Sequence, residues 1–464
     1  TFLGSDPLAL TGSDRAPIEL QRAANALNAQ KPGYEVRVDF MMLPPRPTAG
    51  PPGSGAAPTP FAPTALTLEA AAAGGELAAG SPPPDLALVT SPGDLPALID
   101  RKLIQPLDEA LKTDRSFALE EFVSGALEAV RTRGKIGMLP LAGQVNVLLY
   151  DTALFESASL PPPARDWTWT ALLESARRLT RETPDARHWG ILAHNQVPLL
   201  LGLIWAHGGE LIARDGRRSA ISEPAAREGI QFWTDLIQRH RVAPLPQPTQ
   251  QLIQLQSPSE IGLTAVDAPS GAGAAANMFA FRLTNAVNAS GQQVAMAPGQ
   301  AMPGSRERAA MMLSNTVSSL LPGAAGQRRA VLAAEVPRAR TRATQLSLTA
   351  GLALGAQAQD QKLALRAALA LSDRLQQTPV SIFGLPVRKP DIGLLRRAQP
   401  ALAEDDAAAL ASAMTYSRAL APELAPGLVS TIQQRLMGPL LANQLPLDEA
   451  IRTTASALDE LLRG

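Results

Sequence analysis

The fold of this chain is decided by residues 134–179, GKIGMLPLAGQVNVLLYDTALFESASLPPPARDWTWTALLESARRL, which hold a strand, a rigid connection and a helix start in fixed order. The run 145–150 (VNVLLY) is rich in β-branched and aromatic residues, which suit a buried strand. Pro140 and Gly143 keep the approach to this strand extended and unhelical. We expect the strand to stop at Asp151.

A helix is predicted on either side of the rigid connection. The first is short and runs through Phe155, and Pro161-Pro162-Pro163 follows it. Thr168 or Thr170 is then the expected N-cap of a second helix. Its apolar residues recur on one face: Leu172, Leu173, Ala176 and Leu179. Nothing in 134–179 is a catalytic motif.

The rest of the N-terminal region alternates between strand-like and helix-like segments. The expected strands are 1–4, 34–41 and 85–90, and the expected helices are 18–27 and 66–79. This alternation predicts an α/β sheet with ligands at the carboxyl ends of its strands. Between these segments, residues 43–64 are dense in Pro, Gly and Ala and read as a flexible loop, either a functional lid or a tolerated surface insertion.

Composition bounds the class of protein. A chain of 464 residues with 45% hydrophobic content can bury large cores and favours two or more domains. Its 42 basic and 42 acidic residues cancel, so no basic field indicates nucleic acid or an anionic membrane. Cysteine is absent, which excludes disulfides and thiolate metal sites. The start at Thr1, without an initiator Met or a signal peptide, suggests a processed form.

Catalytic and cofactor motifs are scarce. The histidines do not share any common metal-ligand spacing: His188, His194, His207 and His240. There is no GxSxG or Walker loop. Residues 271–276 match the loose GxGxxA form of a dinucleotide loop, but no acidic residue follows at the distance that would hold a ribose, so a chance match is favoured. We expect no cofactor and no metal, and a hydrolytic enzyme is the less favoured alternative.

Several stretches in order resemble one family, the extracytoplasmic solute-binding proteins of bacterial ABC importers, within the sugar-binding cluster that includes maltose-binding protein. The similar stretches are 82–111, 134–179, 203–244, 259–266, 383–392 and 446–462. The resemblance implies an α/β, two-lobe periplasmic-binding-protein fold (type II, Venus-flytrap) with interlobe crossover strands. In this family 134–179 is similar to the first passage of the chain between lobes.

The resemblance also implies a division of the chain and a role. The first lobe would hold 1–140 plus 268–320 and the second 145–262 plus 345–464, with crossings near 140–145, 262–268 and 320–345. The protein would capture a small polar solute, such as a carbohydrate or related polyol, in the interlobe cleft, and closure would be read by the transmembrane permease subunits. It would be a monomer outside the cytoplasm, periplasmic or lipid-anchored at the outer face of the cytoplasmic membrane.

Ligand contacts are nominated by position in that fold. Loops after strands offer Ser5, Asp6, Ser91 and Asp94, and the first crossing offers Gln144 and Asn146, for which ordinary strand-end polarity is the alternative. Further candidates are Asn195, Gln196, Trp205, Phe383, Arg388 and Tyr416. Asn195 and Gln196 could instead be buried amides fixed on backbone, Trp205 could be core, and Arg388 could be solvated.

Departures from the family pattern argue against an oligosaccharide-binding site. Aromatic residues make up only 4% of the chain, and Ser430 and Thr431 stand where maltose-binding protein has a Trp-Tyr pair. A relative that has lost ligand binding and serves as a scaffold or sensor subunit is therefore a further alternative. A binding site lined with convergent polar groups would favour solute capture, and one lined with Ala, Leu and Val would favour the scaffold.

Overall fold

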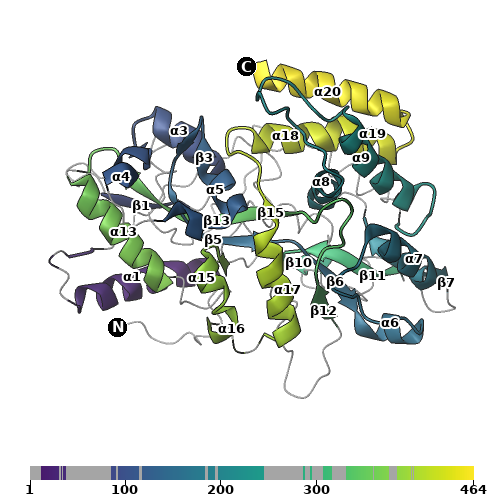
Figure 1. Ribbon diagram of the computed structural model, residues 1–464, viewed down its shortest axis with the longest axis horizontal. Coiled ribbons are helices and arrows are strands. Elements are labelled where there is room, and N and C mark those ends of the chain that lie inside the picture. The colour runs from purple at the N-terminus through teal and green to yellow at the C-terminus, as the bar shows by residue number, and fades with distance from the viewer. Residues whose placement is uncertain are drawn as a thin grey trace, which may run out of the picture.

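The computed structural model describes residues 12–30, 33, 35–37, 85–89, 92–113, 118–182, 187–193, 197–244, 286–287, 293–294, 307–315, 331–358, 360–375, 384–398, 400 and 402–463. The expected loop 43–64 and the expected elements at 1–4 and 66–79 lie outside these residues. Within them the chain forms two main sheets, each with its own helices, and the two halves lie side by side (Figure 1).

The first sheet is built around one long strand, β13 (Thr344–Gly355), whose neighbours β1 and β5 are both antiparallel to it. The other strands of this sheet are β1 (Leu86–Val89), β5 (Leu139–Val145), β14 (Leu385–Pro386) beyond β5, and the short β2 (Ile104–Gln105) and β15 (Ser417–Arg418) beside β13. β13 is buried along nearly its whole length: its first half alternates polar and apolar residues, and its second half, 350–355 (AGLALG), is an unbroken apolar run.

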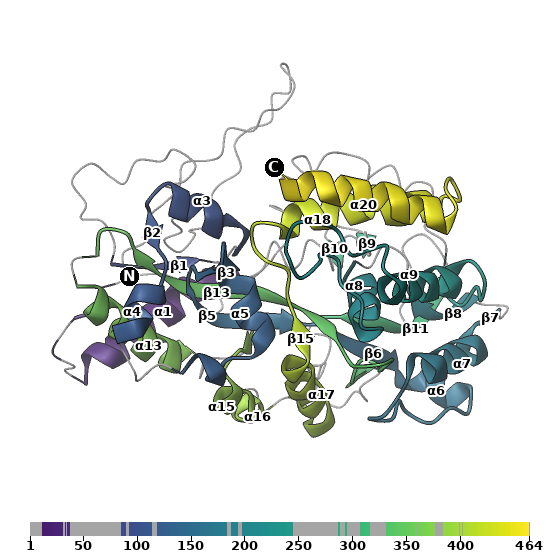
Figure 2. The same ribbon diagram turned by 45° about the horizontal axis from the view of Figure 1, so that its top comes forward.

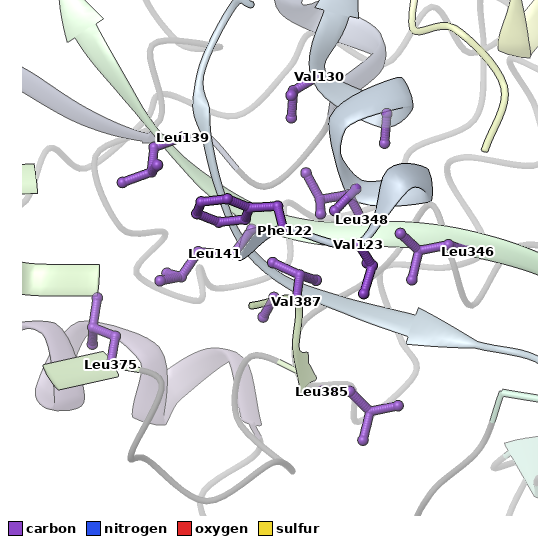
Figure 3. Packing of buried hydrophobic residues seen from close by; sticks show 14 of the residues in the cluster. Phe122, Val123, Val130, Leu139, Leu141, Leu346, Leu348, Leu375, Leu385 and Val387 are labelled. Atoms are coloured by element: carbon purple, nitrogen blue, oxygen red, sulfur yellow. The ribbon is translucent and has the colours of Figure 1, made fainter. Parts of the chain in front are cut away.

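Helices and short turns surround this sheet to form the first half of the molecule. They are α1 (Gly12–Asn28), η1 (Pro92–Asp94), α3 (Leu95–Asp100), α4 (Asp108–Thr113), η2 (Leu119–Glu121), α5 (Ser124–Val130), α13 (Gln361–Leu375), α15 (Lys389–Ile392) and α16 (Leu395–Ala398), with the hairpin β3 (Arg131–Thr132) and β4 (Lys135–Ile136). Figure 3 shows Phe122 between β5 and its neighbours, close to Leu141 and Val387. The side chains of this cluster interdigitate across elements far apart in sequence.

The second sheet has the strand order β12, β6, β11, β8, β7. The bounds of these strands are β6 (Val147–Asp151), β7 (Arg181–Glu182), β8 (Arg187–Leu192), β11 (Glu307–Ser314) and β12 (Val331–Ala334). β11 is central, since it pairs parallel with β8 and antiparallel with β6. Two residues each of β9 (Ala286–Val287) and β10 (Gln293–Val294) form a separate pair.

The helices of the second half pack around this sheet, with the C-terminal helices along one side (Figure 1). They are α6 (Thr152–Ser157), α7 (Trp169–Leu179), α8 (Val197–Ala206), α9 (Pro224–Ile237), α18 (Ala425–Thr431), the π-helical turn η5 (Ile432–Met437), α19 (Gly438–Leu441) and α20 (Leu447–Arg463). One helix, α17 (Glu404–Thr415), packs on strands of both sheets. The carboxylate of Asp406 in this helix is fully buried and accepts a hydrogen bond from the backbone amide of Ala333, at 2.8 Å.

Two buried clusters follow from the period-2 alternation of the strands. Along β6, Val147 and Leu149 belong to a first core that runs from the first sheet onto one face of the second. Leu148 and Tyr150 point the other way, into a second core under α7, α8 and α9. Among the described residues, most of the buried aromatic side chains lie in the second core: Tyr150, Phe155, Trp169, Trp205 and Trp233. These described aromatic side chains therefore serve in packing.

The predicted order of elements in 134–179 is confirmed. Asp151 ends β6 and caps α6 by accepting the amide of Leu154 at 2.8 Å, and Thr168 caps α7 by accepting the amide of Ala171 at 3.2 Å. The strand expected over 145–150 is broken at Asn146, where the chain leaves one sheet and enters the other. In the expected strand 34–41, residues 35–37 form no strand, because the side chain of Asn28 bonds both backbone groups of Val36 at 2.8 Å.

Strand pairing divides the chain differently from the expected boundaries at two places. Residues 307–314, expected in the first lobe, form β11 at the centre of the second sheet. Residues 344–386, expected largely in the second lobe, form β13, α13 and β14 of the first half. The physical reason is that both assignments depend on which distant strand each segment pairs with, and local hydrophobic pattern carries no information on that choice.

Candidate functional site

Three segments of the chain meet where the two sheets join. β5 continues into β6 through Asn146, residues 335–343 lead from β12 to β13, and β15 pairs parallel with the first residues of β13. Figure 2 shows β5 and β13 reaching side by side from the first half toward the second. The three segments therefore share one location, which is the place where a rotation of one half against the other would have its axis.

Hydrogen bonds hold these segments together in a group that we call the crossing node: Asn146, Thr344 and the main chain of Gln345. The backbone amide and the side-chain Nδ2 of Asn146 both donate to the carbonyl oxygen of Gln345, each at 3.2 Å. The hydroxyl of Thr344, which is fully buried, donates to the carbonyl of Asn146 at 2.9 Å. Asn146, a candidate ligand contact, is 5% exposed and its Nδ2 is used inside the node.

Two helices, one from each half, approach the crossing segments closely, each at a glycine. A Cβ on Gly125 of α5 would lie 2.9 Å from the carbonyl oxygen of Ser417. A Cβ on Gly202 of α8 would lie 3.3 Å from the carbonyl oxygen of Ala343. Any larger residue would push the helix away from the crossing segments, so glycine allows the close approach that fixes the node between the two halves.

Tyr416, another candidate contact, lies between the second and third crossing segments. Its hydroxyl accepts the backbone amide of Val336 at 3.3 Å, and the guanidinium of Arg342 lies 5.5 Å from its ring centre. Burial raises the pKa of Tyr416 to about 12, because the phenolate would lose its hydration. Arg342 in turn forms an ion pair with Glu335, and both side chains are less than one-fifth exposed, at 19% and 14%.

Trp205 does not offer a free ring face. It is 3% exposed in the second core, and the guanidinium of Arg418 lies 5.0 Å from its ring centre. Arg418 is held there by both carboxylate oxygens of Glu210, at 2.9 and 3.1 Å. The structure thus places Trp205 as a packing residue under an ion pair, as in the alternative considered for it from the sequence.

Beside the node, one face of the β5–β13 strand pair carries polar side chains. In the β5–β13 pair, Ser347 stands opposite Gln144 and Leu346 opposite Val145, so successive residues point to opposite faces. Leu346 and Val145 are buried in the first core. We call the opposite side of the strand pair the amide face, made by Gln144, Gln345 and Ser347. Gln144 Oε1 and Gln345 Oε1 are buried and have no hydrogen-bond partner in the described part of the chain.

Arg388 and Asp94 are the remaining described candidates. Arg388 lies in the first half, where it pairs with Glu121 at 2.9 Å, with Asp373, and with Asp391 at 3.8 Å. Burial raises the pKa of the Asp391 carboxyl despite this cation. Arg388 is thus committed to three carboxylates. Asp94 is half-buried at the start of α3, in the loop after β1, and is not joined to the amide face by any recorded hydrogen bond.

The other nominated residues lie outside the described part of the chain: Ser5, Asp6, Ser91, Asn195, Gln196 and Phe383. Their contact with a ligand stays a prediction. Among the described residues, no three His, Asp or Glu side chains gather where they could hold a metal ion. None of the described helices is long and apolar enough to span a bilayer.

Sequence reasoning missed Gln345, Ser347, Arg418 and Glu210. The signal for the first two is the alternation in TQLSLT (344–349), where every second side chain from Gln345 is polar. It was not used, because this segment was expected at the end of the third crossing and the start of the second-lobe residues 345–464. Arg418 and Glu210 give no local signal, since they are far apart in sequence and meet only through the fold.

Comparison with known proteins adds a family and a fold. Residues 18–251 match the model of a family described as bacterial extracellular solute-binding protein. No curated protein sequence matches the chain. Three solved structures share its fold at low identity. A sugar transporter protein of Rhizobium etli in an open conformation is 14% identical, with a TM-score of 0.62, and the match covers 94% of this chain and 95% of that one.

The second is the maltose-bound MalE3 protein of T. maritima, 18% identical, with a TM-score of 0.55 and coverage of 96% and 97%. The third is the GacH receptor of Streptomyces glaucescens, whose structures include a complex with acarbose. It is 17% identical, with a TM-score of 0.56 and coverage of 97% and 95%. At these identities the likeness shows a common two-lobe α/β fold.

Proposed function

This chain belongs to the bacterial extracellular solute-binding family, and from that premise we propose that it captures a carbohydrate or related polyol for an ABC importer. The family is one of extracytoplasmic binding proteins and not of enzymes. The observation that carries the proposal is the amide face: Gln144 and Gln345 have buried oxygens with no partner among the described residues, beside the node that joins the two halves. A native protein rarely leaves such groups unpaired unless something else binds them.

The crossing node, where one half would rotate against the other, supports the same function. The proposed lobes are the first half, with the described residues of 12–145 and 344–416, and the second half, with the described residues of 147–314, 331–334 and 425–463, and they are joined at the node. A solute that contacts both lobes would favour the closed state by its differential affinity for it, and no covalent chemistry is needed. In this arrangement Gln144 is the nominated ligand contact from the first crossing, and Asp94 and the candidates outside the described residues would complete the site.

The class of solute is proposed from chemistry and from the relatives. Amide oxygens and a serine hydroxyl offer neutral acceptors and donors, which suit the hydroxyl groups of a sugar. Two proteins of the same fold are described with maltose and with acarbose. No described aromatic ring near the node is free to stack on a sugar, because Arg418 covers Trp205 and Arg342 lies against Tyr416. We therefore favour a small sugar held by hydrogen bonds over a long oligosaccharide.

Partners and location follow from the family. The transmembrane permease subunits of the importer would read closure, and the protein would work as a monomer because closure needs free hinge motion. We propose a periplasmic or lipid-anchored position at the outer face of the cytoplasmic membrane. A scaffold or sensor role is less favoured, because the polar groups of the amide face would then cost stability without a use.

A thermal-shift screen tests the proposal. The panel contains maltose, acarbose and other sugars, with polyols, glycerophosphodiesters, amino acids and short peptides. A solute at a hundredfold excess over its dissociation constant should stabilise the protein by about 2.7 kcal/mol, which is a clear rise in Tm. We expect sugars to give the largest rise. If no member of the panel moves the Tm, solute capture loses its support and the scaffold alternative gains it.

A further inference from the structure

Gln345 is the most unusual polar residue near the node. It is 7% exposed, its Oε1 is buried, and its side chain has no hydrogen-bond partner in the described part of the chain. Burying an amide without partners is unfavourable, so a residue in this position normally either finds a bond or is replaced by an apolar one. No sequence motif had nominated it.

The strand register places Gln345 beside Gln144. Ser347 stands directly opposite Gln144, and Gln345 is two residues from Ser347 on the same face of β13. Diagonal neighbours of this kind are about 7–8 Å apart, which is close enough for two long side chains to reach one group between them. The two unpaired amides are thus on the same face of the same strand pair.

The charged residue that the strand register places beside Gln345 is already neutralised. The residue paired with Gln345 on β15 is Arg418, and both of its outer nitrogens are engaged by Glu210. The opposite face of the strands is apolar. A neutral group that both donates and accepts hydrogen bonds therefore fits the amide pair better than a carboxylate, a phosphate or an ammonium.

The main chain of Gln345 is fixed although its side chain is not bonded. Its carbonyl accepts two hydrogen bonds from Asn146 at 3.2 Å, and its strand pairs with β15. The amide therefore starts from a backbone that is already held in place, so that less order has to be imposed when it bonds a solute. Because Gln345 lies at the node, its contact with a solute would lie where one half rotates against the other.

We propose that Gln345 is a solute-contacting residue that acts with Gln144 on one hydroxyl-bearing group of an uncharged solute. This inference rests on the proposed solute-binding function and adds a specificity-determining residue to it. The two amides select for a neutral hydroxyl group, and their contact lies on the strands about which the lobes move.

The test is Gln345→Met, which keeps the length and removes the amide. Two quantities are measured: the Tm of the ligand-free protein, and the Kd for the sugar that gave the largest shift in the screen. We expect the Tm to stay equal or rise, because an unpaired buried amide has been removed, and the Kd to weaken at least tenfold. Gln345→Asn, which keeps a shorter amide, should give a smaller loss and serves if the Met variant does not fold.

Gln238→Met is the matched control, because the side-chain nitrogen Nε2 of Gln238 donates to the carbonyl of Leu440 at 2.7 Å and to Oδ1 of Asn443 at 3.1 Å. It should lower the Tm and leave the Kd unchanged. If Gln345→Met instead lowers the Tm with an unchanged Kd, Gln345 has a structural role and the inference is overturned. If the unaltered protein binds no sugar of the panel, the proposed function fails first, which the screen reveals without any variant.

The double variant Gln144→Met with Gln345→Met tests whether the two amides act together. Two contacts to one group give a combined loss of affinity smaller than the product of the single losses. Fully multiplicative losses would overturn the assignment of both residues to one group.

Discussion

The crossing node and the amide face lie on the same strands but treat polar groups in opposite ways. In the node, the Thr344 hydroxyl donates to the Asn146 carbonyl, and the Asn146 carboxamide nitrogen donates to the Gln345 carbonyl, so these buried polar groups are bonded within the fold. On the amide face, Gln144 and Gln345 hold buried oxygens that bond nothing in the described part of the chain. Polar groups that keep a fold together are satisfied within it, whereas a buried group without a partner costs stability unless something else binds it.

The largest expected effect comes from breaking a bonded pair beside the node. Arg342→Met leaves the Glu335 carboxylate in a site where it is only 14% exposed, without its cation. The free energy of unfolding should fall by about 3 kcal/mol, near the lower end for a broken buried pair. Urea denaturation measures it.

Arg227→Met is the control for this pair, because Arg227 and Asp448 are 45% and 73% exposed and their ion pair should be worth at most about 1 kcal/mol. The double variant Arg342→Met with Glu335→Met should recover most of the lost stability. Equal losses in Arg342→Met and Arg227→Met would contradict the contrast between the crossing and the surface.

The next effect concerns the node itself. Thr344→Val keeps the shape of a side chain that is 0% exposed and removes its hydrogen bond to the Asn146 carbonyl. We expect a loss of about 2 kcal/mol in the free energy of unfolding, since a buried acceptor is left unpaired. Thr415→Val removes a similar bond, to the Ser412 carbonyl at 2.7 Å, from an exposed site and should change little. An unaffected Thr344→Val protein would show that the node is not held by this bond.

A third effect appears only at high pH. The pKa of Tyr416 is raised to about 12 by burial, whereas an unfolded tyrosine ionises near about 10. Above pH about 10 the unfolded chain therefore binds fewer protons than the folded one, so stability is intact below that pH and falls as the pH rises toward about 12.

The expected loss in the unfolding free energy is about 1.4 kcal/mol by pH 11. Tyr416→Phe should remove this increment from the pH dependence, measured as the difference between the two proteins because burial also raises the pKa of Tyr150. Parallel pH profiles for the two proteins would argue that the Tyr416 phenol is more hydrated than its packing between the crossing segments indicates.

The smallest effect on stability is expected on the amide face. Gln144→Met should leave the free energy of unfolding within about 0.5 kcal/mol of the unaltered protein, because the Gln144 side chain gives up no internal bond. Its Kd for the sugar found in the screen should weaken about fivefold, the equivalent of about 1 kcal/mol for one hydrogen bond. Isothermal titration measures it. A change below about twofold would place the binding site elsewhere.

Local sequence was sufficient wherever a structure depends on neighbours along the chain. The end of the strand at Asp151, the N-cap Thr168 as one of two candidates, and the apolar face of α7 were predicted because each needs only side chains a few residues apart. Gln144 was nominated from the family resemblance, by its place at the first crossing. For Trp205, sequence position was compatible with both a binding platform and a core residue, and burial under Arg418 decided between them.

Sequence by itself determined the α/β class, the family resemblance and the first crossing, since these are written in periodicity and in ordered motifs. Only the tertiary structure decided that β11 belongs to the second sheet and β13 to the first, that Asn146 is bonded inside the node, and that the Gln345 Oε1 beside Gln144 has no partner within the described ranges. The physical reason is that strand pairing and side-chain satisfaction join residues about two hundred positions apart in this chain, as with Asn146 and Gln345 at a separation of 199, and such contacts leave no local pattern.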